Sequence, residues 1–218
     1  MKKFISLVLL VMTFSITALG CSPKKDISAE QTTQALYNLY VKADGEESKE
    51  LGIFDEDIDS ILESQKDNSI SSARLSFVGS GLTITDEDLE EIYNLQVEAL
   101  RKLTPTISIE SETEEEIIIN LSTNYVNATE STTKAAEDAI AKATESEITS
   151  RSEVSKLFID NLLESLSSLE PSSETVEASF EFIKEKTTID NKEIEIWIPK
   201  DSMSFAKELV SMTTGVEQ

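Results

Sequence analysis

The sequence contains no histidine and only one cysteine, Cys21. The absence of histidine excludes Ser-His-Asp and Cys-His catalysis, and with a single cysteine it also excludes the histidine- and cysteine-ligated zinc sites. One cysteine cannot form a disulfide within the chain, so the hydrophobic core has to stabilise the fold unaided. Any catalysis would have to use carboxylates, lysine, tyrosine or a Ser-Lys pair.

Basic residues are scarce as well. The 218-residue chain has 19 Lys and Arg against 42 Asp and Glu, which gives a formal net charge of −23. Nucleic acids and anionic headgroups repel such a surface, so nucleic acid is excluded as a partner. The acidity does not indicate disorder, because apolar residues recur at regular spacing along most of the chain.

The first 21 residues are built like a bacterial secretory signal that ends in a lipidation site. Lys2 and Lys3 precede an almost wholly apolar run at residues 4–16. The stretch Ala18-Leu19-Gly20-Cys21 then resembles the lipobox of bacterial lipoproteins, although Ala18 stands where leucine is usual. In that family the cysteine thiol receives a diacylglyceryl group and the cysteine becomes the mature N-terminus.

This resemblance implies a signal peptide at residues 1–20 and a lipidated tether at residues 21–27. Fatty-acyl chains such as palmitate on Cys21 would hold the protein on the extracytoplasmic face of the cell membrane. A plain secretory signal and a membrane-spanning anchor are the alternatives. The apolar run of about 13 residues is too short for a span, which needs roughly 20.

Six stretches after the tether show the spacing of amphipathic helices. Most begin with a capping residue and end at glycine or proline. The first starts at the capping box of Ser28 and Gln31, and the third starts at Thr85 and stops at Pro105. The other four follow Asp55, cover the alanine-rich residues 135–143, open at Ser150, and begin at Asp201.

Two segments alternate apolar and polar residues instead. Ile107 and Ile109 are followed by an alternating run at residues 117–125, and a second pair of runs covers residues 176–182 and 194–198. Each pair predicts a β-hairpin with one apolar face. The fold class is therefore α+β: one domain at residues 28–218, with an antiparallel sheet of about four strands (two hairpins) packed against about six helices. The order helix-helix-hairpin occurs twice, by duplication or by coincidence of common helix patterning.

Five runs carry a resemblance that covers residues 28–215. They are Ala35-Leu-Tyr-Asn-Leu-Tyr-Val-Lys-Ala-Asp44, Leu51-Gly52-Ile53, Gly81-Leu82-Thr83-Ile84-Thr85, Ala135-Ala136-Glu137-Asp138-Ala139 and Trp197-Ile198-Pro199. Together they are similar to a family of low-GC Gram-positive surface lipoproteins catalogued as a domain of unknown function. The resemblance implies a surface location and a single domain. It implies no activity and no site residues.

The run Asp55-Glu56-Asp57-Ile58-Asp59 has acids at alternate positions, as in the first half of an EF-hand loop. The template then fails, because position six is Ser60 rather than glycine and position twelve is Lys66 rather than glutamate. The acids fit the first turn of a helix, where the helix dipole favours negative charge. We therefore expect no metal site and no cofactor.

Three classes of function remain open from the sequence. The first is a non-catalytic binding or interaction module, anchored to the membrane through lipid on Cys21. The alternative is a carrier of a small molecule or peptide, with a pocket between sheet and helices. The third is a carboxylate-based enzyme such as a glycosidase, whose chemistry needs no histidine. We favour the binding module and expect no enzymatic activity.

Trp197, the only tryptophan, is the candidate partner-binding residue. Ile194, Ile196 and Ile198 are expected on the apolar face of the last strand, so alternation places Trp197 on the opposite face. Two interpretations compete there. The last helix or a loop folds back and covers the ring, or Trp197 anchors a small exposed patch for a wall or membrane partner.

Overall fold

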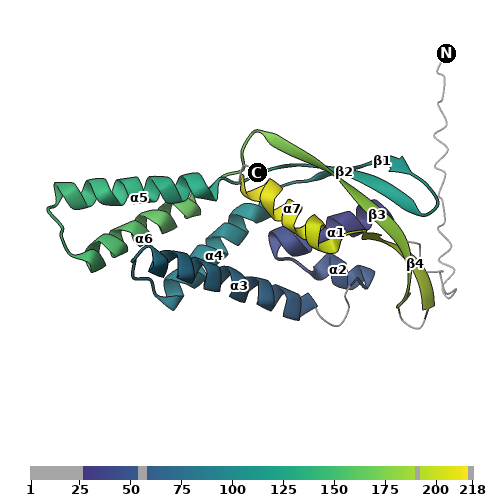
Figure 1. Cartoon of the computed structure of the whole chain (residues 1–218), viewed down its shortest axis with the longest axis horizontal. Coiled ribbons are helices and arrows are strands. Elements are labelled where there is room, and N and C mark those ends of the chain that lie inside the picture. Colours follow the sequence, from purple (N-terminus) through teal and green to yellow (C-terminus); the bar gives the residue numbers. More distant parts are fainter. Residues whose placement is uncertain (1–26, 54–57, 190–191, 216–218) are drawn as a thin grey trace, which may run out of the picture.

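A four-stranded antiparallel sheet with helices against one face is the centre of the computed structural model, which describes residues 27–53, 58–189 and 192–215 (Figure 1). The strands are β1 (Thr106–Glu112), β2 (Glu116–Asn124), β3 (Thr175–Ile189) and β4 (Lys192–Pro199). Each strand pairs with the next along the chain, in the order β1-β2-β3-β4. The predicted α+β class and its two antiparallel hairpins are confirmed.

Seven helices occur in these ranges. They are α1 (Ala29–Lys42), α2 (Glu46–Leu51), α3 (Ile58–Gly79), α4 (Asp86–Arg101), α5 (Ala128–Glu145), α6 (Arg151–Ser167) and α7 (Ser202–Thr214). Six correspond to the predicted helices, and the short α2 is additional. The predicted order of two helices and a hairpin is present twice, as α3-α4-β1-β2 and α5-α6-β3-β4.

Local hydrogen bonds start two of the predicted helices. Ser28 Oγ accepts a bond from Gln31 N at 3.3 Å, and Gln31 Oε1 accepts one from Ser28 N at 3.0 Å. Thr85 and Asp88 form the same reciprocal pair at the start of α4. Each box satisfies two N–H groups that the helix itself leaves unbonded, so these starts could be read from the sequence.

Helices α1 and α7 cover the inner face of the sheet and bury the main hydrophobic cluster. Phe205 of α7 packs edge-to-face against Phe180 and Phe182 of β3, with ring centroids 4.8 and 5.6 Å apart. Tyr37 of α1 is fully buried beside them, and its hydroxyl is hydrogen-bonded to Thr123 Oγ1 of β2 at 2.8 Å.

The strand pairing corrects the predicted face of β4. Trp197 pairs with Lys184, which shares a face of β3 with Phe182, so Trp197 lies on the side of the main cluster. Ile194 and Ile196 lie on the other side and pack with Ile27 in a separate small cluster. The alternation was right, but the face that meets the core carries Glu193 and Glu195 as well as Trp197, so the sequence alone did not indicate it.

Trp197 is consequently covered. Only 8% of its surface is exposed, and the Nζ atom of Lys184 lies 4.9 Å from the centre of its ring. Of the two interpretations of Trp197, the covered one is correct. The exposed patch is wrong, because packing in the main cluster occupies the surface that a partner would need.

Helices α3, α4, α5 and α6 form a helical lobe with its own hydrophobic cluster. Phe77 of α3 packs edge-on against Phe158 of α6 at 6.0 Å, and Ala135 and Ala139 of α5 complete the contact. Helix α4 joins the two parts, since its Ile92 belongs to this cluster and residues near its end belong to the main one. Figure 1 shows α5 and α6 side by side at the end of the molecule away from β4.

Tyr37→Phe should lower the free energy of unfolding by about 1 kcal/mol, the usual net contribution of one buried hydrogen bond. The loss is limited because Thr123 Oγ1 still donates to the backbone oxygen of Asn124 at 3.0 Å. Urea unfolding measures the change. Tyr40→Phe, at the half-buried edge of the same cluster, is the control and should lose less than half as much.

The pH dependence of stability should also differ between the native protein and Tyr37→Phe. Burial raises the pKa of Tyr37 to about 12 from its ordinary value of 10.0. The unfolded chain releases this proton first, so stability should fall as the pH rises from 10 to 12. The fall should be shallower in Tyr37→Phe, and an equal slope in both proteins would contradict the assignment.

Candidate functional site

The chain leaves β2 through a short segment that holds three elements at one point. Val126 N donates to the backbone oxygen of Thr213 in α7 at 2.9 Å, and Ser172 N, just before β3, donates to the oxygen of Tyr125 at 2.7 Å. Asn127 caps α5 by accepting a bond from Glu130 N at 3.0 Å. The start of α5, the end of α7 and the entry to β3 therefore converge around Tyr125.

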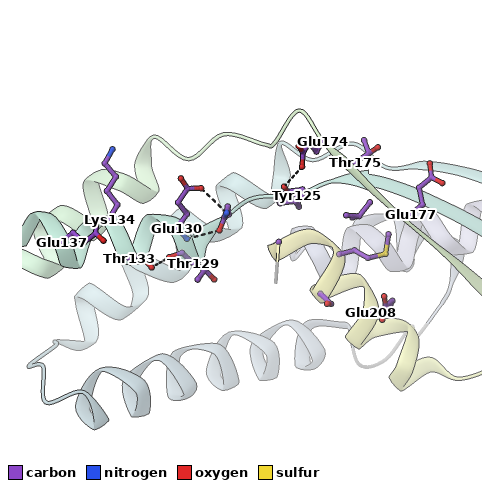
Figure 2. Close-up of a pocket in the computed structure, with 15 residues that line it drawn as sticks. Tyr125, Thr129, Glu130, Thr133, Lys134, Glu137, Glu174, Thr175, Glu177 and Glu208 are labelled. Atoms are coloured by element: carbon purple, nitrogen blue, oxygen red, sulfur yellow. Dashed lines mark hydrogen bonds between the residues drawn. The ribbon is translucent and has the colours of Figure 1, made fainter. Parts of the chain in front are cut away.

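A cleft of about 1000 Å³ lies between these three elements. Figure 2 shows α5 on one side, the start of β3 on another and α7 below. Tyr125 lines it at the junction, and its hydroxyl donates to Glu174 Oε2 at 3.2 Å. It lies where the sheet meets the helical lobe.

The charges that line the cleft are of one sign with a single exception. The carboxylates come from all three sides: Glu130 and Glu137 from α5, Glu174 just before β3 and Glu177 within it, and Glu208 from α7. Lys134 is the one basic side chain in the lining. A single exposed ion pair contributes at most about 1 kcal/mol. Like charges gathered around a hollow add their fields, however, and raise the local concentration of a cation.

Gly215 fixes the wall of the cleft where α7 ends. Its φ of 65° lies in the left-handed region, which favours glycine. A Cβ at this position would lie only 2.7 Å from Cδ2 of Tyr125. The close approach of the α7 end to the Tyr125 ring therefore depends on the absence of a side chain.

The candidates from the sequence lie elsewhere. Cys21 and residues 55–57 fall outside the described residues. Asp59 is exposed and ion-paired with Lys49. Trp197 does not line the cleft.

Two kinds of feature are absent from the described ranges. No three acidic or thiol side chains there come close enough together to hold a metal ion. Likewise, no helix within those ranges has both the length and the apolar character that a membrane span requires.

Sequence reasoning missed the cleft because its residues are far apart in the chain. Each glutamate, taken alone, is typical of a solvated helix or strand end. Asn127 was the one local signal, since a capping residue there fixes where α5 begins. Only the strand pairing and the packing of α7 bring Glu137, Glu177 and Glu208 around one hollow.

Comparisons with known proteins place the fold. No protein-family model matches the chain, and no curated protein matches it by sequence. The structure is similar to the crystal structure of ycdA from Bacillus subtilis strain 168, which is described as a candidate lipoprotein. The two share 17% sequence identity with a TM-score of 0.58, over 87% of this chain and 56% of that one. The likeness shows a shared fold, and this chain spans just over half the length of that protein.

Gly215→Ala should disturb the cleft. The new methyl group has to displace the Tyr125 ring, which breaks the Tyr125–Glu174 hydrogen bond, and the left-handed backbone adds about 1 kcal/mol of strain. Urea unfolding and the chemical shifts of Tyr125 measure these changes. Gly79→Ala is the matched control, since nothing lies within 4 Å of a Cβ there. It should be neutral or stabilising, and an equal loss in both variants would contradict the assignment.

Proposed function

We propose that the protein is a lipid-anchored, extracytoplasmic binding module that holds a cationic ligand in the cleft of Figure 2. The observation that carries the proposal is the composition of the lining, with five glutamates and one lysine around about 1000 Å³. A cationic group entering the hollow meets carboxylates from α5, β3 and α7 at once. Their fields add around the hollow, and because four of the five glutamates are exposed, added salt should screen the attraction.

The anchor rests on Cys21 and its lipobox. The structural neighbour from Bacillus subtilis, described as a candidate lipoprotein, supports this part of the proposal. Two or more acyl chains give stable anchoring where a single chain does not.

The proposed role is non-catalytic. With no histidine in the chain and Cys21 assigned to lipid, the available nucleophiles and bases are carboxylates, lysines and hydroxyls. The cleft gathers its carboxylates on separate elements that line an open hollow, which suits the recognition of positive charge. Binding is therefore the function that this geometry supports best.

A small-molecule carrier is the second candidate, and one observation favours it. A carrier was expected to have its pocket between the sheet and the helices, and the cleft lies at the edge of that interface. The interior of the interface is filled by Phe180, Phe182 and Phe205. A carried ligand would therefore occupy the cleft, and a small polycation such as spermine is its probe.

Cys21→Ala should remove the anchor. The variant should appear as shed protein or as uncleaved precursor, whereas the native chain should partition with detergent as mature protein. Detergent-phase separation and mass spectrometry of intact protein measure both. A variant that still fractionates as a mature, detergent-phase protein of the native mass would contradict lipidation.

Reversal of the charge in the cleft should weaken the binding of a cation. Glu137→Lys with Glu177→Lys should lower the affinity for a fluorescent tetralysine peptide about tenfold at low salt, a change of about 1.4 kcal/mol. Anisotropy titrations measure it, and added salt should reduce the difference.

The matched control is Glu112→Lys with Glu114→Lys, at the exposed β1–β2 turn. It changes the net charge by the same amount and leaves the cleft intact, so its affinity should change less than about twofold. An equal loss in the two double variants would show that bulk charge, and not the cleft, attracts the peptide.

A further inference from the structure

Helix α5 separates the acidic cleft from a second hollow of different character. Thr129, Thr133 and Glu137, four residues apart on one face of α5, line both. They form a shared stripe about 12 Å long, given a rise of 1.5 Å per residue. The two hollows are therefore neighbours across the stripe.

The second hollow is an apolar groove of about 650 Å³ between the end of α3, α5 and α6. Phe77, Leu82, Ala136, Ile140, Val154 and Phe158 supply its apolar walls. Ile140 is 63% exposed at its rim. Large apolar side chains gathered in this way around one hollow indicate an interaction site.

We propose that the cleft and the groove form one bipartite site for a cationic amphipathic peptide segment. Its apolar side chains would lie in the groove, and its lysine or arginine side chains would cross the stripe of Thr129, Thr133 and Glu137 to the glutamates of the cleft. This inference rests on the proposed function, whose ligand class it makes specific. The mode is that of an amphipathic helix laid in a groove.

Charge complementarity selects this occupant over two others. Glu137 stands at the boundary of both hollows, and four more glutamates lie beyond it in the cleft. An anionic lipid surface is repelled by that rim. A second copy of a chain with a formal charge of −23 is repelled as well. A segment with basic residues along one side of an apolar face would place its apolar side chains in the groove and its positive charges beside the glutamates of the cleft.

The test uses the mature lipidated protein in zwitterionic nanodiscs, with empty nanodiscs as the reference. One probe is a fluorescent helical peptide of leucine and lysine, about 14 residues or roughly four turns long. The other has the same lysines with serine in place of leucine. The leucine-lysine peptide should bind about tenfold more tightly than the serine-lysine peptide.

Two variants separate the halves of the site. Ile140→Ser should weaken the leucine-lysine peptide about fivefold and leave the serine-lysine peptide unchanged, whereas Glu137→Gln should weaken both peptides. Val210→Ser is the matched control, because Val210 is also a β-branched, exposed helical residue, 49% exposed on α7 and outside both hollows. It should change neither affinity.

The outcomes are distinct. Equal binding of the two peptides, or no effect of Ile140→Ser, would overturn the bipartite site and leave the proposed function standing. Binding of neither peptide would overturn the proposed function as well. Binding to anionic vesicles that Ile140→Ser abolishes would favour a lipid surface instead. Self-association by sedimentation that Ile140→Ser abolishes would favour a second copy, and either result would overturn the inference.

Discussion

The buried hydrogen bond between Tyr37 and Thr123 ties the first helix to the second strand, and the rest of the structure is arranged around that end of β2. Within a few residues of Thr123, Val126 bonds to α7, Tyr125 bonds to the entry of β3, and Asn127 caps α5. A phenol carried into an apolar cluster is costly unless it is paired, so the position of Thr123 relative to α1 is strongly specified. The position of the cleft depends on the same contact, because the residues that follow Thr123 bond to the three elements that form its walls.

Local chemistry could be read from the sequence wherever it acts over a few residues. The capping boxes at Ser28 and Thr85, the alternation of the strands and the turns all follow from short-range rules, and the structure has them. Helix α2 was not predicted because it is only six residues long, between Gly45 and Gly52. A tertiary hydrogen bond from Ser48 Oγ to the backbone oxygen of Ala35 supports it. The face of β4 was assigned wrongly for a related reason. Its register is set by pairing with Lys184 and neighbouring residues of β3, which no local pattern contains. The cleft depends on three such tertiary relations at once.

The composition also determines how the cleft responds to its surroundings. Histidine is the side chain whose ordinary pKa lies between pH 5 and 8, and the chain has none. The shifts that the fold imposes move groups away from neutrality: burial raises the pKa of Tyr40 and Tyr93, and the hydrogen bonds of Lys200 to Glu181 and Glu116 raise the pKa of its ammonium. The acidic character of the protein is thus held constant over the physiological pH range. Ionic strength is the variable to which attraction of a cation responds.

The position of α5 and α6 in the chain, between the paired strands β2 and β3, has a consequence for how the protein folds. Residues 125–174 lie between two central strands that are direct neighbours, and Asn124 and Thr175 at the two ends of this insertion are register partners. Closing a long flexible loop before any contact forms is entropically costly. Helices form and pair quickly by comparison, and two helices packed side by side return the chain close to where it departed. The α5–α6 pair thus occupies the place of a turn between β2 and β3, and we expect the joining of the two local hairpins into one sheet to follow the pairing of helices that belong to a different hydrophobic cluster.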